Sequence, residues 1–222
     1  MLGTIHVIDF EGNRTYGILE YGLVTLKNNT IADLSAADCG SNSDHSAAHF
    51  TEHSRFSSNG ETKSFEYHLP FFIKKRAEGI FCAHGASVED RLLRQYCLTP
   101  GKIDSPSDEH NPQNVPQTAP SENPQSPPST TMATMKNISW GPWIDTYKIY
   151  RKYYPAAERY EVAGLIHHFG LEKKLKDRVA KHNLSKTLTF HRAPYDALAT
   201  ALLLQNFINH FQIKDVRFLL NH

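Results

Sequence analysis

The spacing of apolar and polar positions changes along the chain and divides it into three blocks. In the first block, residues 1 to about 35, the short-period apolar runs predict three strands. Gly12-Asn13 and Asn28-Asn29 supply turn residues between them. We therefore expect three turn-connected strands, at residues 4–10, 15–26 and 30–34.

The second block, residues 62–97, changes period and predicts a helix, a short buried strand and a second helix. Their expected ranges are 64–79, ended by Gly79, then 80–84, then 87–96. The third block, 140–222, begins with strand-like 143–146 and continues through helices, the longest at about 193–210. Strands first, then helices alternating with strands, predict an α/β fold with a mixed β-sheet flanked by helices.

Two polar stretches interrupt these blocks. Residues 101–139 hold seven of the twelve prolines and no aromatic residue, so they cannot bury enough apolar surface to offset chain entropy. We expect a disordered insertion there, with a flexible tether for a partner as the alternative. Residues 38–62 are rich in Ser, His and Asn, and we expect a mobile loop. Residues 1–222 are then a single domain.

Composition and charge indicate the environment in which the protein works, but by themselves they do not choose a function. A strand-like pattern begins almost at the first residue, so we expect neither signal peptide nor membrane span, and a cytoplasmic location. The three cysteines, Cys39, Cys82 and Cys97, form no close pair, which favours reduced thiols. The net charge of +1 provides no global basic field, so any contact with nucleic acid must be local.

Asp9 and Glu11 are the most informative acidic residues, because they close the first predicted strand with i, i+2 spacing. Both side chains then emerge on one face of the strand. Neighbouring carboxylates repel each other unless a cation lies between them, and carboxylate oxygens suit Mg²⁺ or Mn²⁺. The alternative is a solvated strand end before the turn at Gly12.

A second polar group stands near the end of the chain, in the segment from His191 to Ala197. Pro194 suits the first turn of a helix, which places Asp196 in that turn and His191 on the lead-in loop. A loop His and a helical Asp can converge on one point. Read separately, His191 is a surface residue and Asp196 an ordinary first-turn acid.

The segment between them contributes one further acid. Ser87 and Asp90 have the spacing of a capping box, which assigns Asp90 to the helix terminus and leaves Glu89 to point elsewhere. Glu89 is therefore the candidate fourth acid, with Asp90 as the alternative ligand.

Four short segments, VIDFEG (7–12), AHGASVEDRLL (83–93), WIDT (143–146) and HRAPYDALA (191–199), carry a resemblance. In order and approximate spacing they resemble the DEDDh family of 3′–5′ exonucleases, which includes proofreading subunits of bacterial replicative polymerases. The resemblance runs from residue 3 to about 205. It implies a ribonuclease-H-like fold and removal of nucleotides from single-stranded or frayed 3′ ends of DNA or short RNA, with a DNA polymerase as a possible partner.

The same resemblance implies a role for each matched residue. Two divalent cations, Mg²⁺ or Mn²⁺, would be held by Asp9, Glu11, Glu89 and Asp196. His191 would act as general base on the attacking water. The resemblance also implies three residues that contact the substrate. Phe10 would offer an aromatic face on which the terminal nucleotide stacks, the main chain of Gly12 would approach that nucleotide closely, and His84 would also bind substrate.

The second motif departs from the family pattern. Where the family has His-Asn-Ala-x-Phe-Asp, this chain reads His84-Gly85-Ala86-Ser87-Val88-Glu89. Glu therefore replaces Asp, one methylene longer, and Gly85 lacks the amide side chain. The departure supports an alternative function, a catalytically weakened nuclease-fold module that binds single-stranded nucleic-acid ends.

Overall fold

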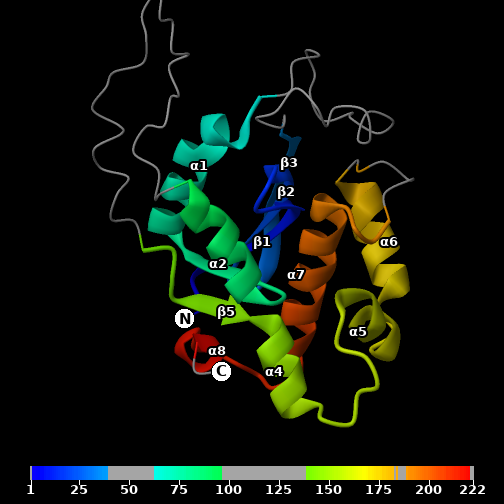
Figure 1. The fold of residues 1–222 in the computed structure, drawn as a ribbon. Coiled ribbons are helices and arrows are strands. Elements are labelled where there is room, and N and C mark those ends of the chain that lie inside the picture. The colour runs from blue at the N-terminus through cyan, green and yellow to red at the C-terminus, as the bar shows by residue number, and fades with distance from the viewer. Residues whose placement is uncertain (1, 40–62, 97–138, 183, 185–188, 221–222) are drawn as a thin grey trace, which may run out of the picture.

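A five-stranded mixed sheet forms the centre of the computed structural model, which describes residues 2–39, 63–96, 139–182, 184 and 189–220 (Figure 1). The strand order is β3-β2-β1-β4-β5, with β1, β2 and β3 antiparallel and β4 and β5 parallel to β1. The strands are β1 (Thr4–Asn13), β2 (Gly17–Lys27), β3 (Thr30–Asp38), β4 (Ile80–Ala83) and β5 (Trp143–Asp145).

Helices cover both faces of this sheet. In Figure 1 the sheet lies between α1 and α2 on one side and α7 on the other. The helices are α1 (Phe65–Glu78), α2 (Ala86–Gln95), α4 (Thr146–Tyr153), α5 (Val162–His168), α6 (Glu172–Lys181), α7 (Ala193–His210) and α8 (Arg217–Leu220). The expected α/β architecture, a mixed sheet flanked by helices, is confirmed.

Alternation along β1 divides the apolar core in two. Ile5 and Val7 face α7 and belong to one buried cluster, which also includes side chains of α4, α5 and α6. Ile8 and Phe10 face the other way and pack with α1 and α2. Helix α7 is apolar almost all round and buried along most of its length, as expected for a helix covered on both sides.

The first two hairpins show how local sequence sets the register. Asn28 and Asn29 both have positive φ, 47° and 64°, which Asn tolerates better than most residues, and they connect β2 to β3. In the first hairpin Gly12 and Asn13 still pair with β2, so the strand runs further than the predicted residue 10. The Asn13 side chain shapes the turn that follows by accepting the N–H groups of Thr15 and Tyr16.

The predicted boundaries at the start of α2 and at the end of β5 were also wrong. Helix α2 begins at Ala86 with Gly85 as its N-cap, and no side-chain cap is formed, so Ser87 lies inside the helix and is not the capping residue. Gly85 has φ of 89°, which a glycine adopts at little cost and which turns the chain directly from β4 into α2. Thr146, predicted at the end of a strand, instead opens α4, and Asp145 caps that helix by accepting the Lys148 N–H.

Several sequence expectations fall outside the described residues. These are the predicted loop at 38–62, apart from Asp38 and Cys39, the predicted insertion at 101–139, apart from Ser139, and Cys97. Cys39 and Cys82 are buried free thiols. Across the described ranges, none of the helices combines the length and the apolar character that crossing a bilayer requires.

Candidate metal centre

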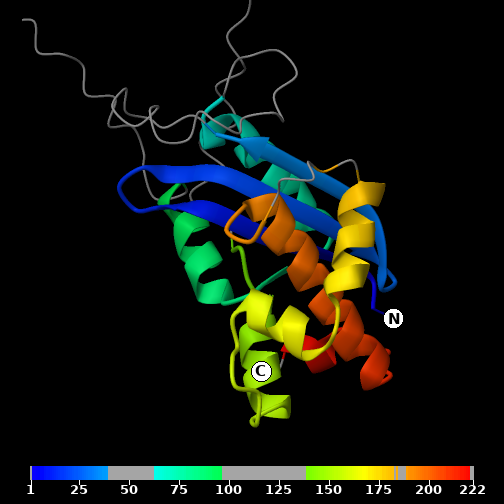
Figure 2. The same cartoon turned by 90° about the vertical axis from the view of Figure 1, so that its right-hand side faces the viewer.

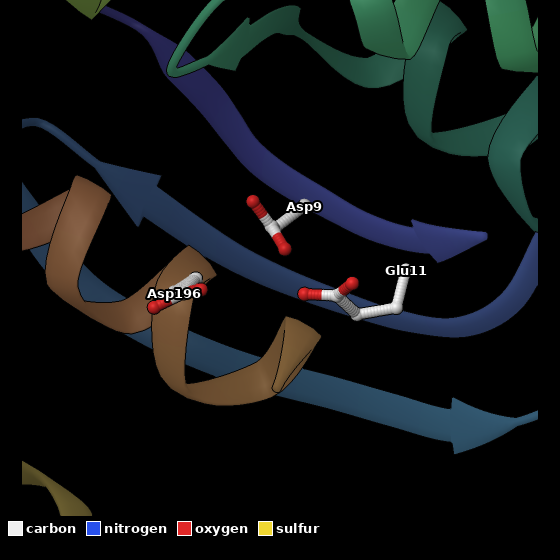
Figure 3. Close-up of side chains that lie close together, drawn as sticks. All are labelled: Asp9, Glu11 and Asp196. Atoms are coloured by element: carbon white, nitrogen blue, oxygen red, sulfur yellow. The ribbon is translucent and has the colours of Figure 1, made fainter. Parts of the chain in front are cut away.

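Three carboxylates from two distant parts of the chain meet at the start of α7. Oxygen atoms of Asp9, Glu11 and Asp196 all lie within 4.8 Å of one another. Figure 3 shows Asp9 and Glu11 projecting from β1 toward the first turn of α7, where Asp196 faces them. These are three of the four acids to which the resemblance assigns the metals.

Strand alternation accounts for the first two acids. Because successive side chains of a strand point to opposite faces, Asp9 and Glu11 share the α7 face of the sheet. Phe10, between them, must point to the other face, where it is 6% exposed and packs against Phe65 and Phe72. The open aromatic face that was expected to stack on a nucleotide is therefore used in the core.

A glycine in β2 lets the start of α7 approach the sheet. Gly22 pairs with Asp9 across the β1–β2 ladder. A Cβ atom at Gly22 would lie 2.3 Å from the Ala193 carbonyl oxygen and 2.6 Å from Pro194 Cα, closer than any side chain allows. Pro194 occupies the first turn of α7, as predicted, and Asp196 follows in the same turn. Close packing at Gly22 thus brings Asp196 to the level of Asp9.

A buried ion pair fixes the same end of the helix. The Arg192 guanidinium donates from Nε to both Glu20 carboxylate oxygens, at 3.0 and 3.1 Å, and from Nη2 to Oε1 at 2.6 Å. Glu20 also accepts the Ala193 N–H at 2.9 Å, which satisfies a backbone donor at the N-terminus of α7. Because Glu20 sits opposite Glu11 in the ladder, this clamp holds α7 at the edge of the acidic cluster.

Sequence reasoning missed Glu20, Arg192 and Gly22. A signal for Glu20 was present, because it is an acidic residue within the apolar run of β2 and a buried charge needs a partner. The partner, Arg192, lies 172 residues along the chain, a pairing that local patterns do not reveal.

Glu89 is the acid of α2 that faces the cluster. It is 5% exposed, accepts the Phe10 N–H, and leaves its Oε2 atom without a hydrogen-bond partner among the described residues. Asp90 is engaged elsewhere, since it accepts the Trp143 Nε1–H at 3.0 Å and the Arg94 Nε–H at 2.5 Å. Asp90 thus has structural partners, although not through the predicted capping box.

Burial and nearby carboxylates raise the pKa values of all four acids. Burial is the largest cause for each; it raises the pKa of Glu89 to about 8, of Glu11 to about 7 and of Asp196 to about 6. The pKa of Asp9 is raised well above its usual range, first by burial and then by the charges of Glu89, Asp196 and Glu11. The neighbouring Arg192 only partly offsets this at Glu11. Without a cation, the cluster therefore keeps protons on some of its carboxyls near neutral pH, and a cation that binds there would displace them.

This donor set fits a divalent cation. All the donors are carboxylate oxygens, the ligands that Mg²⁺ and Mn²⁺ prefer. Asp196 Oδ1 and Glu89 Oε2 are buried atoms with no hydrogen-bond partner in the described part of the chain, and a cation would satisfy them. It would also offset the repulsion that raises the pKa values.

His191 lies beside this cluster on the loop that leads into α7. Its backbone N–H donates to Asp196 Oδ2 at 2.9 Å, and its φ is 70°, a left-handed conformation that is uncommon for a residue other than glycine. The residue is exposed, so its side chain is accessible to solvent and to a substrate. The positive φ reverses the chain at His191, which leaves its N–H directed at Asp196.

The two other residues expected near the substrate have structural contacts. A Cβ at Gly12 would lie 2.1 Å from the Gly17 carbonyl oxygen, so glycine is needed there by the hairpin itself. The His84 ring contacts Thr146 Oγ1 at 3.0 Å and the Tyr160 carbonyl oxygen at 2.6 Å. These contacts hold the end of β4 against α4, and contact of Gly12 or His84 with substrate stays a prediction.

Comparison with known proteins bears on the fold. No protein-family model matches the chain, and no curated protein is similar to it in sequence. Among solved structures, the chain is similar to exonuclease X in complex with 5′-overhanging duplex DNA, with a TM-score of 0.56 and 20% identity over 95% of this chain and 94% of that one. The five-stranded mixed sheet with flanking helices is thus a ribonuclease-H-like fold, which the chain shares with that structure.

Proposed function

We propose that this chain is a metal-dependent 3′–5′ exonuclease that hydrolyses phosphodiester bonds at the 3′ end of DNA or short RNA. The observation that carries the proposal is the convergence of Asp9, Glu11 and Asp196 within 4.8 Å, with the buried acid Glu89 beside them. The similarity in fold to a DNA-bound exonuclease supports it. The proposed substrate is a single-stranded or frayed 3′ end.

Each acid has a proposed place in this chemistry. Asp9 would contact two divalent cations, Mg²⁺ or Mn²⁺, with Glu11 and Asp196 completing one site and Glu89 supporting the other. When bound, the cations supply electrostatic stabilisation of the phosphoryl oxygens and of the departing 3′ oxygen.

His191 would take the proton from the attacking water. An imidazole can accept a proton near neutral pH, and this one lies on an exposed loop from which it can pass the proton to solvent. The hydrogen bond from the His191 N–H to Asp196 holds the main chain of this residue next to the acidic cluster.

The test uses DNA and RNA oligonucleotides labelled at either end, incubated with Mg²⁺ or Mn²⁺. Wild type should shorten at least one of the two substrates, DNA or RNA, stepwise from the 3′ end. The substitutions Asp9→Asn and His191→Ala should each abolish this activity. Asp215→Asn is the matched control, since it removes one exposed acid paired with Arg217 on another part of the surface. Cleavage that persists in Asp9→Asn, or that begins at the 5′ end, would refute the proposal.

A specific observation keeps the alternative function in view. Glu89 stands where an Asp was expected, and its carboxylate is already engaged by the Phe10 N–H. If this weakens the second cation site, the chain is a module that binds single-stranded 3′ ends without cutting them. Wild type that is inert with every substrate and metal, yet binds single strands, would support this alternative. Association with a DNA polymerase and a cytoplasmic location stay predictions.

A further inference from the structure

A basic hollow lies beside the acidic cluster, between the tip of the β1–β2 hairpin and helix α2. Its volume is about 520 Å³, and it is lined by Arg14 from the hairpin and by Arg91, Arg94 and Gln95 from α2. Figure 2 shows the blue hairpin projecting from the sheet, with the green helix α2 next to it. This hollow is separate from the carboxylates assigned to the metals.

The charge of this basic hollow is positive and only partly balanced. Arg94 is paired with Asp90, whose other oxygen accepts the Trp143 Nε1–H. Arg14 and Arg91 are exposed, and no carboxylate within the described ranges forms an ion pair with either guanidinium. Two exposed cations are therefore available to a ligand that carries negative charge.

The two walls of the basic hollow are tied together. The Tyr96 hydroxyl, at the end of α2, accepts the Ile18 N–H of β2 at 2.8 Å. Glycine at position 17 makes this contact possible, since a Cβ there would lie 2.3 Å from the Tyr96 oxygen. The hairpin also presents Tyr16, which is 42% exposed, on the same turn as Arg14. An exposed aromatic ring beside arginines is typical of surfaces that bind nucleic acids.

The basic hollow is carried by the same two elements as the acidic cluster. Arg14 follows Glu11 by three residues, and Arg91 follows Glu89 by two residues of helix α2, a rise of about 3 Å.

We propose that this basic hollow binds backbone phosphates of the nucleic-acid substrate other than the scissile one. The inference rests on the proposed function. Arginine suits this role because its planar fork donates two parallel hydrogen bonds to phosphate. Such contacts are independent of base sequence, and they favour substrates long enough to span both sites.

The test measures binding without divalent ions, so that cleavage plays no part. Anisotropy of labelled single-stranded and 5′-overhanging duplex oligonucleotides is followed across a salt series for wild type and Arg14→Ala/Arg91→Ala. The double variant should bind more weakly at every salt concentration, with the slope of log K against log salt reduced by about 1.4–1.8 for two lost phosphate contacts. Lys74→Ala/Lys214→Ala removes the same charge from exposed positions elsewhere and should keep the wild-type slope.

A cleavage measurement separates this inference from the proposed function. On a 20-mer the double variant should lose kcat/KM, whereas on a dinucleotide, whose only phosphate is the scissile one, it should match wild type. Equal slopes for the double variant and the lysine control would overturn the phosphate site, even if wild type proves to be an active exonuclease. Wild type that binds as proposed but cuts nothing would overturn the exonuclease assignment and leave the phosphate site standing.

Discussion

Replacing Asp196 with Asn should stabilise the metal-free protein and abolish its stabilisation by Mg²⁺. Burial, with the charge of Glu20 adding to it, raises the pKa of Asp196 from 3.8 to about 6. At about 1.36 kcal/mol per pKa unit, the ionised carboxylate costs the folded state up to about 3 kcal/mol. Asn keeps an oxygen that can accept the His191 N–H, so the amide removes the charge with little loss of hydrogen bonding.

The effect should depend on pH with a definite sign. Because the pKa of Asp196 is higher in the folded than in the unfolded state, folding takes up a proton between about pH 4 and 6, and the penalty is fully present above that window. We expect a gain of roughly 1–2 kcal/mol at pH 8, about 3–6 °C in Tm for a chain of this size, and little gain near pH 4. Wild type with Mg²⁺ should show a rise in Tm at pH 8 that the variant lacks.

The assay is thermal unfolding in EDTA and in Mg²⁺ at both pH values. Asp215→Asn makes the same chemical change at an exposed site, where an ion pair with Arg217 lowers the pKa of the carboxyl to about 2, and it should produce no gain at either pH. A variant at position 196 that is no more stable than wild type at pH 8, or equally stabilised at pH 4, would show that the converging charges do not strain the metal-free fold.

Three further substitutions test the scaffold. Gly22→Ala should lower the free energy of unfolding by roughly 1–3 kcal/mol, because the new methyl group meets the main chain of α7, and it should also remove the Mg²⁺-induced rise in Tm; wild-type values for both would contradict the close approach. Arg192→Ala leaves Glu20, 4% exposed, without its cation and should cost about 3 kcal/mol in urea unfolding; a loss as small as that of an exposed pair would contradict the clamp. Phe10→Leu should cost about 1 kcal/mol of stability while kcat/KM stays within twofold of wild type; a tenfold loss of kcat/KM would indicate a stacking role.

The sequence predicted those parts of the site that local periodicity determines. Asp9 and Glu11 follow from the two-residue period of a strand, and Asp196 follows from a proline that opens a helix. The same period already implied that Phe10 faces away from the acids, so its expected stacking role conflicted with the pattern that identified its neighbours. The misplaced capping box at Ser87 has a different cause, since a left-handed Gly85 can begin a helix without any side-chain cap.

The contacts that hold the site together could not be predicted in the same way. The pairing of Glu20 with Arg192 and the packing of α7 over Gly22 join segments more than 170 residues apart, and they exist only once the sheet and helix have docked. The sequence around either partner does not indicate which residue it will contact. Sequence reasoning therefore found the acids, and the structure was needed to find what positions them.

The acids at this site oppose the docking of α7, because each brings a charge into a buried cluster that already carries others. The Glu20–Arg192 clamp and the alanines of α7 act in the other direction, since they fix the helix by contacts that do not involve the cluster acids. The position of α7 is thus set by contacts that a cation does not supply, which lowers the cost of reorganisation when a cation binds. The stability that the fold gives up by burying these charges is recovered when a divalent ion neutralises them, so cation affinity and folding should be coupled throughout.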